Sequence, residues 1–230
     1  MKRVLYFCLG LMGFLSLLCS VAAACVTNGN LMLQGFSQYS QTAHLDVSPA
    51  RYGDYAHAIA AYLDGKAAAV QVPDPEAGNQ LTDAFSEKEN RHLTDVRAIV
   101  SFLKGARWIG GGGVILVLAA LYFPGRHQRE LFLRDAVRGF AGAAGAIVCA
   151  ALILLMWGLI NFDGLFVTFH KIAFTNDLWL LNPRTDLLVA LMPLPFFTWY
   201  AGELLKSLLP ILLVMLLTVI AYFKTKEPAP

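Results

Sequence analysis

Long apolar segments alternate with polar ones along this chain. Four segments are mainly apolar, and they cover residues 1–24, 108–123, 140–162 and 207–223. A helix needs roughly 20 apolar residues to cross a bilayer. The pattern therefore predicts a mainly α-helical membrane protein with four transmembrane helices.

The first apolar segment also has features of a secretory signal peptide. Lys2 and Arg3 precede the apolar run Val4–Ala24, and the run ends in three alanines that resemble a cleavage site. A signal peptide, however, has an apolar core of only about 7–15 residues, and further spans follow here. We therefore expect the first helix to remain uncleaved.

Basic residues indicate the orientation in the membrane, because lysine and arginine are enriched in cytoplasmic segments. They cluster at both ends of the chain and in the connection between the second and third spans. We therefore expect both termini and this connection to be cytoplasmic. The clustered residues are Lys2, Arg3, Arg126, Arg129, Arg134, Arg138, Lys224 and Lys226.

The polar segments complete the expected domain organisation, in which two outer loops form an extracytoplasmic cap. In chain order, we expect the first transmembrane helix at 1–24, the extracytoplasmic cap at 25–107, the second transmembrane helix at 108–123, a cytoplasmic basic loop at 124–139, the third transmembrane helix at 140–162, a second outer loop at 163–206, the fourth transmembrane helix at 207–223 and a cytoplasmic tail at 224–230.

Two helices are predicted within the cap. Tyr52–Leu63 has apolar residues at helical spacing, and Gly65 follows as a stop signal. Ser86 followed by Glu89 fits a capping box, in which the two side chains satisfy backbone N–H groups at a helix start. This motif predicts a helix that runs from Glu87 to Leu103.

The remaining polar segments have weaker patterns. Short strands are expected around Leu31–Phe36 and Val70–Val72. Val72–Gly78 is predicted to be a turn or loop by its Pro, Asp and Gly content. Two prolines interrupt Leu187–Trp199, so we expect this segment to lie in the membrane interface or under the cap. Pro210 falls in the first turn of the fourth span, where a missing N–H is tolerated.

Composition supports the membrane assignment. The chain is 57% hydrophobic and 15% charged, whereas soluble domains carry about 25% charged residues. Gly110–Gly113 and residues 141–146 provide small-residue surfaces on which membrane helices can pack closely. The cysteines show no paired spacing typical of a disulfide framework or a zinc site, and we interpret them as small membrane-helix residues. They are Cys8, Cys19, Cys25 and Cys149.

Candidate chemistry concentrates in the two outer loops. His92 lies in EKENRHLTD, residues Glu87–Asp95, and His170 lies in FHKIAFTNDLWLLNP, residues Phe169–Pro183. Imidazole titrates near neutral pH, so two histidines held together can act as a general acid and base. We predict that His92 and His170 meet at the outer membrane surface. The other histidines have contexts typical of surface residues, and they are His44, His57 and His127.

Asp95 is the first candidate for a supporting role. It follows His92 by three residues, so the two side chains share a helix face. A carboxylate there can fix the tautomer of the imidazole and raise its basicity. The alternative is an ordinary surface position, with Arg91 or Arg97 as its ion-pair partner.

The second motif contributes further candidates. Asp177 either supports the site or caps a turn, while Trp179 and Phe169 either wall a pocket or belong to an interfacial aromatic belt. Two histidines and Asp95 would give zinc three ligands, but no HExxH or related spacing accompanies them, so we expect no metal. GxSxG and phosphate-binding loops are also absent from the sequence, and no basic outer patch indicates nucleic acid.

Three motifs resemble those of a known family. They are RHLTDV at Arg91–Val96, FHKIAFTNDLWLLNP at Phe169–Pro183 and DYAHAIAAYLDG at Asp54–Gly65. Together with the four spans, they resemble the lipoprotein intramolecular transacylases and related four-span integral membrane proteins of bacteria, over nearly the whole chain. The resemblance implies that His92 and His170 are catalytic.

The same resemblance implies a reaction and a location. The sn-2 acyl chain of a diacylglyceryl lipoprotein would move to the α-amino group of its N-terminal cysteine, giving a lyso-form lipoprotein. The active site would lie on the outer face of the bacterial cytoplasmic membrane. Diacylated lipoproteins and membrane lipid are the implied partners, with no cofactor. Tyr55 is implied as a supporting residue, and Leu194 stands where the family pattern has a carboxylate.

Two other functions fit the same residues. One is a membrane hydrolase, with or without zinc, that acts on lipid or peptide. The other is a non-enzymatic membrane sensor or assembly protein whose outer loops bind a ligand. A transporter is disfavoured, because the predicted spans carry almost no polar residues at mid-depth.

Overall fold

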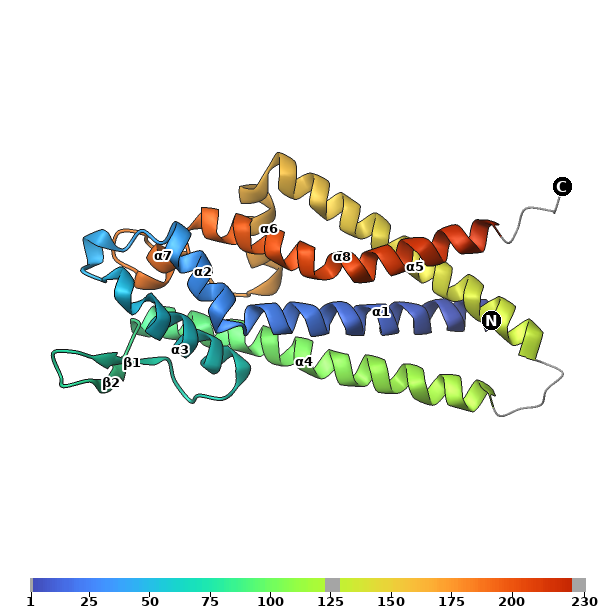
Figure 1. Ribbon diagram of the computed structural model, residues 1–230, viewed down its shortest axis with the longest axis horizontal. Coiled ribbons are helices and arrows are strands. Elements are labelled where there is room, and N and C mark those ends of the chain that lie inside the picture. The colour runs from blue at the N-terminus through green and yellow to red at the C-terminus, as the bar shows by residue number, and fades with distance from the viewer. Residues whose placement is uncertain (1, 123–128, 225–230) are drawn as a thin grey trace. The chain divides into compact units, whose positions relative to one another are not determined.

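The computed structural model describes residues 2–122 and 129–224 and is mainly helical (Figure 1). The helices are α1 (Lys2–Val26), α2 (Gly29–Tyr39), α3 (Tyr52–Asp64), α4 (Glu87–Tyr122), α5 (Arg129–Ile160), α6 (Phe162–Ala173), α7 (Leu187–Leu191) and α8 (Leu194–Lys224). The other described elements are the short 3-10 helices η1 (Ala43–Leu45) and η2 (Pro49–Arg51) and the strands β1 (Gln71–Asp74) and β2 (Gln80–Asp83).

Three of the described helices are long and apolar enough to cross a membrane. Their candidate spans are Val4–Val26 in α1, Asp135–Ile160 in α5 and Leu194–Ile220 in α8, which correspond to the first, third and fourth predicted spans. The second predicted span, 108–123, is the end of α4, but Phe123 and several side chains before it lie outside the described residues. The second of the four predicted spans therefore stays a prediction.

Several helices are longer than the sequence pattern suggested. α4 continues without a break beyond Leu103, because no proline separates its polar and apolar halves. α5 already begins at Arg129, so part of the predicted basic loop is helical. α8 begins at Leu194, with Pro195 in its first turn, where proline is tolerated. Pro210 therefore lies inside this helix, and its placement in a first turn was wrong.

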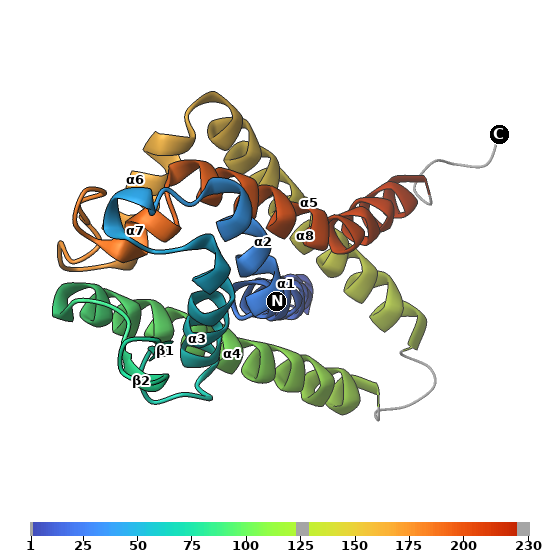
Figure 2. The same cartoon turned by 60° about the vertical axis from the view of Figure 1, so that its left-hand side comes forward.

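The short elements confirm some of the weaker predictions and contradict others. Leu31–Phe36 is helical rather than a strand, since it belongs to α2, whose Asn28 N-cap side chain accepts a hydrogen bond from the Leu31 N–H at 3.1 Å. Val72 lies in a strand as expected, because β1 pairs with β2 in an antiparallel hairpin beside α3 (Figure 2). Gly65 ends α3 in the left-handed conformation, with φ of 83°, as a C-cap glycine does.

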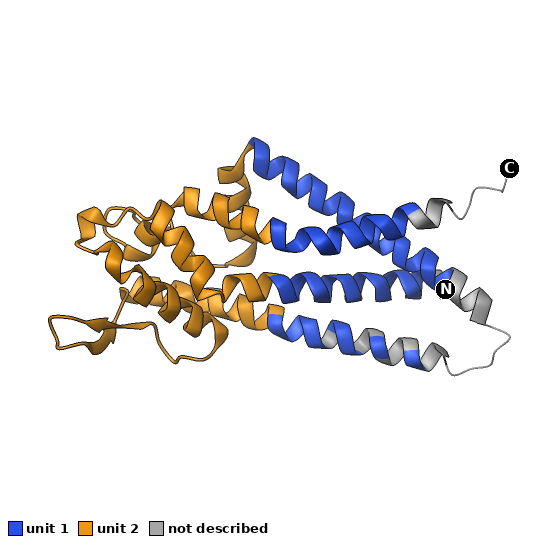
Figure 3. Ribbon diagram, in the orientation of Figure 1, with its two compact units in different colours: residues 1–21, 104–160, 206–230 blue, residues 22–103, 161–205 orange. Residues whose placement is uncertain are grey.

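The described chain forms two compact units (Figure 3). In the first, which comprises residues 1–21, 104–160 and 206–230, small residues allow helices to approach closely. A Cβ added to Gly139 would lie 2.4 Å from the Cβ of Tyr6, and one added to Gly110 would lie 2.8 Å from the Cβ of Ser16. Ala144 is fully buried in the same unit. The predicted small-residue packing is thus confirmed at Gly110 and Ala144, whereas Gly139 lies outside the predicted surfaces.

The second unit comprises residues 22–103 and 161–205 and contains every candidate site residue. Its core joins α2, α3 and α7 with the first part of α4 and the start of α8. Phe36, Ile59 and Leu191 are fully buried there, and the ring of Phe36 lies 5.7 Å from that of Phe196. This packing brings segments from both predicted outer loops into one body.

Candidate active site

The polar start of α4 holds the first histidine in place. The Ser86 N–H and hydroxyl donate hydrogen bonds to Glu89 Oε2 at 2.8 and 2.6 Å, and the Glu89 N–H donates to Ser86 Oγ at 3.4 Å. This reciprocal arrangement confirms the predicted capping box. It begins α4 at Glu87 and sets the turn of helix that carries His92 into the interior, where His92 is 7% exposed.

The second histidine lies in the last turn of α6. Asn161 caps this helix, because its side-chain oxygen accepts from the Gly164 N–H at 2.8 Å. His170 is buried, and its Nδ1 lies 2.8 Å from the carbonyl oxygen of Phe166, one turn earlier. A carbonyl only accepts hydrogen bonds, so Nδ1 must carry the proton. In the neutral ring, Nε2 is then the nitrogen with a free lone pair.

The structure brings the two predicted histidines together. The ring centroids of His92 and His170, hereafter the histidine pair, lie 6.3 Å apart with an interplanar angle of 32°. No hydrogen bond joins the two rings among the described contacts. Each ring therefore keeps hydrogen-bonding capacity for another molecule, and the pair has the geometry to hold one reacting group from two sides.

Aromatic rings surround the histidine pair. Trp179 and Phe169, both predicted candidates, have ring centroids 5.0 and 5.3 Å from that of His170. Phe166 lies closer, at 4.1 Å, and Phe174 lies 5.5 Å from His170 and 5.1 Å from His92. Phe174 belongs to the aromatic second motif, whereas Phe166, four residues before His170, was not predicted. That spacing places Phe166 on the same helix face as His170.

Asp95 does not have the predicted relation to His92. Its Oδ2 accepts a hydrogen bond from the Asn176 side-chain amide at 2.9 Å, and His92 Nδ1 is buried without any hydrogen-bond partner. The carboxylate is drawn away because Asn176 sits in a turn, where its own oxygen accepts from the Leu178 N–H at 3.1 Å. Asp95 therefore acts on His92 only through its charge.

Two other predicted supporting residues make no hydrogen bond or ring contact with the pair among the described contacts. Asp177 is exposed, and its backbone carbonyl accepts from the Leu180 N–H at 3.1 Å, which fits the turn alternative. Tyr55 is buried in the core, with its ring centroid 6.2 Å from that of Phe85. The Arg51 guanidinium lies 5.3 Å from the Tyr55 ring centroid. Both residues thus have structural contacts that account for their positions.

The other histidines that the structure describes have ordinary partners. In His57, Nδ1 bonds the Gly53 carbonyl at 2.7 Å and Nε2 contacts Asn30 Oδ1 at 3.2 Å. His44 bonds the Pro183 carbonyl at 2.9 Å. His127 lies outside the described residues. Within the described part of the chain, no group of three or more His, Cys, Asp or Glu side chains can hold a metal ion.

Burial keeps both rings of the histidine pair neutral. For His92, burial is the largest cause, followed by the charge of His170, and together they lower the pKa to about 4 against the opposing effect of Asp95. Burial also lowers the pKa of His170, although its bond to the Phe166 carbonyl opposes this change. At neutral pH each ring therefore offers one N–H donor and one lone pair.

The lowered pKa of His92 predicts a pH effect on stability. An unfolded chain binds protons on this ring near pH 6.5, and the folded protein does so only near pH 4. Stability contributed by the neutral ring is therefore present above pH 6.5 and is lost as the pH falls from 6.5 towards 4. The melting temperature of the detergent-solubilised wild type should fall more steeply across this window than that of His92→Gln. Parallel curves would contradict the assignment.

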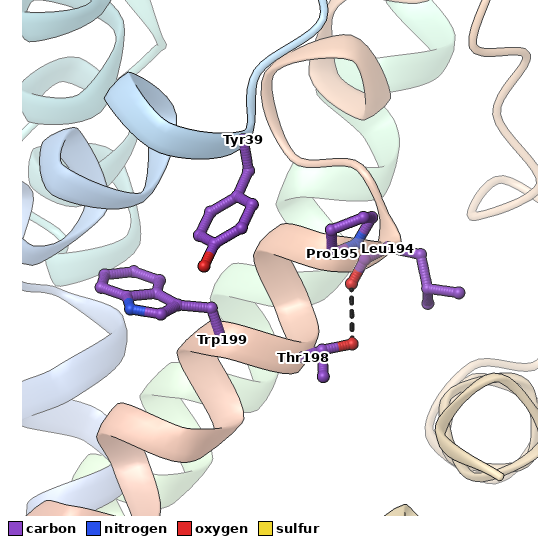
Figure 4. Close-up of a pocket in the computed structure, with 5 residues that line it drawn as sticks. All are labelled: Tyr39, Leu194, Pro195, Thr198 and Trp199. Atoms are coloured by element: carbon purple, nitrogen blue, oxygen red, sulfur yellow. Dashed lines mark hydrogen bonds between the residues drawn. The ribbon is translucent and has the colours of Figure 1, made fainter.

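A surface pocket lies in the same unit at the start of α8 (Figure 4). It has a volume of about 460 Å³, and the rings of Tyr39 and Trp199 face it from two helices with centroids 5.9 Å apart. Leu194 also lines it and is exposed. The histidine pair is not part of this pocket, whose lining is mainly apolar.

Comparisons with known proteins identify relatives. A family model described as lipoprotein intramolecular transacylase Lit matches residues 7–197. No curated protein matches the chain. Among solved structures, the chain is similar to the membrane integral lipoprotein intramolecular transacylase Lit from Bacillus cereus, with 18% sequence identity and a TM-score of 0.73. The alignment covers 98% of this chain and 97% of that one, which shows a shared fold.

Proposed function

The chain belongs to the lipoprotein intramolecular transacylase family, and on this premise we propose that it moves the sn-2 acyl chain of a diacylglyceryl lipoprotein to the α-amino group of the same molecule's N-terminal cysteine. The product is a lyso-form lipoprotein. The observation that carries this proposal is the buried histidine pair, with ring centroids 6.3 Å apart in an aromatic setting. Such a pair provides general acid and base groups without a protein nucleophile.

The reaction is an isomerisation of the substrate. The lone pair of the cysteine α-amino nitrogen attacks the carbonyl carbon of the sn-2 ester. A C–N bond forms, the C–O bond to the glyceryl group breaks, and one proton moves from the nitrogen to the glyceryl oxygen. Because no water or second substrate takes part, the total mass of the lipoprotein is unchanged.

His170 is best suited to be the base. Its Nδ1–H donates to the Phe166 carbonyl at 2.8 Å, so the free lone pair of the neutral ring is on Nε2. A helix-bound carbonyl thereby holds both the tautomer and the ring direction, as the third member of a triad does for its histidine. Nε2 would take the proton of the attacking amine.

His92 is best suited to stabilise the carbonyl oxygen by donating a hydrogen bond, while the proton that His170 takes from the amine passes on to the glyceryl oxygen. Its pKa of about 4 keeps the ring neutral, so it offers a single N–H donor in a site with little water. Its Nδ1 is buried and unpartnered, and leaving a buried polar group unsatisfied costs about 1–3 kcal/mol. A substrate oxygen that accepts from this nitrogen, or a group that donates to it, would remove that cost.

Positioning supplies the rest of the proposed catalysis. An ester and an amine on one molecule need orientation more than activation, and a well-oriented intramolecular reaction gains about 7–11 kcal/mol. The rings of Phe166, Phe169, Phe174 and Trp179 lie within 5.5 Å of the His170 ring, centroid to centroid. Such rings would limit access of water and favour transfer over hydrolysis.

The proposal extends to the setting of the enzyme. Four transmembrane helices with an extracytoplasmic cap would place the histidine pair at the outer face of the bacterial cytoplasmic membrane, with both termini inside. Diacylated lipoproteins embedded in the same bilayer would supply the substrate. No cofactor is required, because every step is a proton or acyl transfer.

A labelled lipopeptide tests this function. The purified protein is incubated with a diacylated lipopeptide that carries palmitoyl at sn-1 and oleoyl at sn-2, mixed with a second peptide whose oleoyl chain is deuterated. We expect oleoyl on the α-amino nitrogen, with each label remaining on its own peptide. Free oleic acid with a lighter lipopeptide would show hydrolysis, and exchange of labels would show intermolecular transfer. Either result would overturn the proposal.

A further inference from the structure

We infer that Glu89 is a positioning residue, which ties the histidine-bearing turn of α4 to the start of α7 and thereby holds the two sides of the site in register. This inference rests on the proposed function. The sequence motif assigns Glu89 only to the capping box. The structure gives its carboxylate a second partner that is distant in the sequence.

The burial of Glu89 is unusual for an acidic residue. Its exposed fraction is 2%, although glutamate is almost never fully buried unless it is paired. Its hydrogen-bond donors come from Ser86 and Leu188, and none of them is a cation. Each oxygen of a carboxylate in this position needs at least one of these bonds, because an unsatisfied buried oxygen is costly.

The two oxygens of the carboxylate serve different segments. Oε2 accepts from the Ser86 N–H and hydroxyl, within the cap of α4. Oε1 accepts from the Leu188 N–H at 2.6 Å, in the first turn of α7. Leu188 is itself buried, so this bond lies inside the core and is screened from water. One side chain thus joins parts of both predicted outer loops.

Both ends of this connection lead to the histidine pair. Glu89 precedes His92 by three residues, so the two side chains lie on one face of α4. Leu188 ends the segment 174–188, which begins with the ring that contacts both histidines and includes Trp179. A shift of α7 against α4 would therefore move Phe174 and Trp179, and with them His170, relative to His92.

Neighbouring bonds from α4 to the same segment are exposed. Lys88 Nζ donates to the Leu180 carbonyl at 2.6 Å, and Asp95 accepts from Asn176 at 2.9 Å. Hydrogen bonds open to water contribute little, because water replaces either partner. Of these three bonds from α4, the one between Glu89 and Leu188 is buried. We therefore expect it to fix the position of segment 174–188, and the two exposed bonds to contribute less.

The matched variants are Glu89→Gln, Ser86→Ala and Lys88→Met. Glutamine keeps the shape of glutamate, but its side chain has one acceptor oxygen and one NH2 group. In either orientation the NH2 group therefore faces the donors of Ser86 or the N–H of Leu188, and hydrogen bonding is lost there. Ser86→Ala removes both hydrogen bonds of the Ser86 hydroxyl and leaves those from the Ser86 and Leu188 N–H groups to Glu89. Lys88→Met removes the exposed bond nearby. If Glu89 acted only as part of the helix cap, Ser86→Ala would lower kcat as much as Glu89→Gln does.

Two readouts separate positioning from general stability. For the folded fraction of each variant, we expect Glu89→Gln to lower kcat by about 10²-fold, the cost of a displacement near 1 Å, with KM nearly unchanged. The acid limb of its pH profile should move to higher pH, because loosened packing exposes the histidines. Ser86→Ala and Lys88→Met should keep kcat within a few-fold and leave the pH profile unchanged.

A third readout does not depend on activity. Arg184 is exposed within segment 174–188, so trypsin cleavage after it reports how firmly that segment is held. Cleavage should be faster in Glu89→Gln than in wild type and unchanged in the two controls. If the wild type shows no acyl transfer, this measurement still tests the connection. Wild-type cleavage in Glu89→Gln, or an equal loss of kcat in Ser86→Ala, would overturn the inference.

Discussion

His170→Ala is expected to lower kcat/KM for acyl transfer by about 10²–10⁴-fold, the usual contribution of a general base. The ring is held by the Phe166 carbonyl at 2.8 Å, and the aromatic side chains that surround it carry no basic group. The rate is measured with the lipopeptide described above, in detergent micelles of fixed composition.

His57→Ala is the matched control. It removes a histidine of the same structural unit whose ring bonds Gly53 and Asn30 rather than the site. Its kcat/KM should stay within a few-fold of wild type. Full activity in His170→Ala, at a normal melting temperature, would remove His170 from the mechanism. Equal losses in both variants would point to a general effect on folding.

His92→Ala should cause a loss of similar size, but its conservative variant should behave differently. His92 is proposed to act as an N–H donor, and a glutamine amide retains a donor, so His92→Gln should keep more activity than His92→Ala. His170 is proposed to accept a proton, which an amide does not do at neutral pH. His170→Gln should therefore be as impaired as His170→Ala.

The comparison of the two glutamine variants decides the assignment of roles. More activity in His170→Gln than in His92→Gln would show that His92 is the base and His170 the hydrogen-bond donor. Equal recovery in both variants would show that neither ring needs to accept a proton, which contradicts the acid–base account. Melting temperatures of all four variants check that the differences arise from chemistry and not from folding.

The histidine pair was predictable from the sequence because each ring stands in a distinctive polar and aromatic motif. EKENRHLTD and FHKIAFTNDLWLLNP are separated by two apolar segments, and the structure brings their histidines to a centroid distance of 6.3 Å. The capping box was equally readable, since it depends only on residues three apart. Features that depend on residues close together in the sequence, such as the capping box, were thus predicted correctly.

Partners set by tertiary packing were not predictable in the same way. Asp95 was expected at His92 because the two share a helix face, but Asn176 approaches from another segment and takes its hydrogen bond. The second bond of Glu89, to the Leu188 N–H, has no signal in the spacing of either motif. Such contacts arise only when segments distant in the sequence pack together.

Some predicted helix boundaries were wrong for a related reason. The prolines in Leu187–Trp199 led to a predicted start of the last span at residue 207, and the helix that carries His92 was predicted to end at Leu103. Pro210 is nevertheless inside α8, and α4 runs from Glu87 to Tyr122 through Gly105. In long apolar helices, packing and backbone hydrogen bonding outweigh a single unfavourable residue, as tertiary context often does with propensity.

The most direct test of the histidine pair is a double-variant cycle on acyl transfer. It measures kcat/KM for wild type, His92→Ala, His170→Ala and the double variant, with the N-acylated product identified by fragmentation of the lipopeptide. Residues that act as one catalytic unit give strongly non-additive effects. We predict that the double variant is no slower than the slower single variant. Losses that multiply, or full activity in either single variant, would contradict a joint catalytic role for His92 and His170.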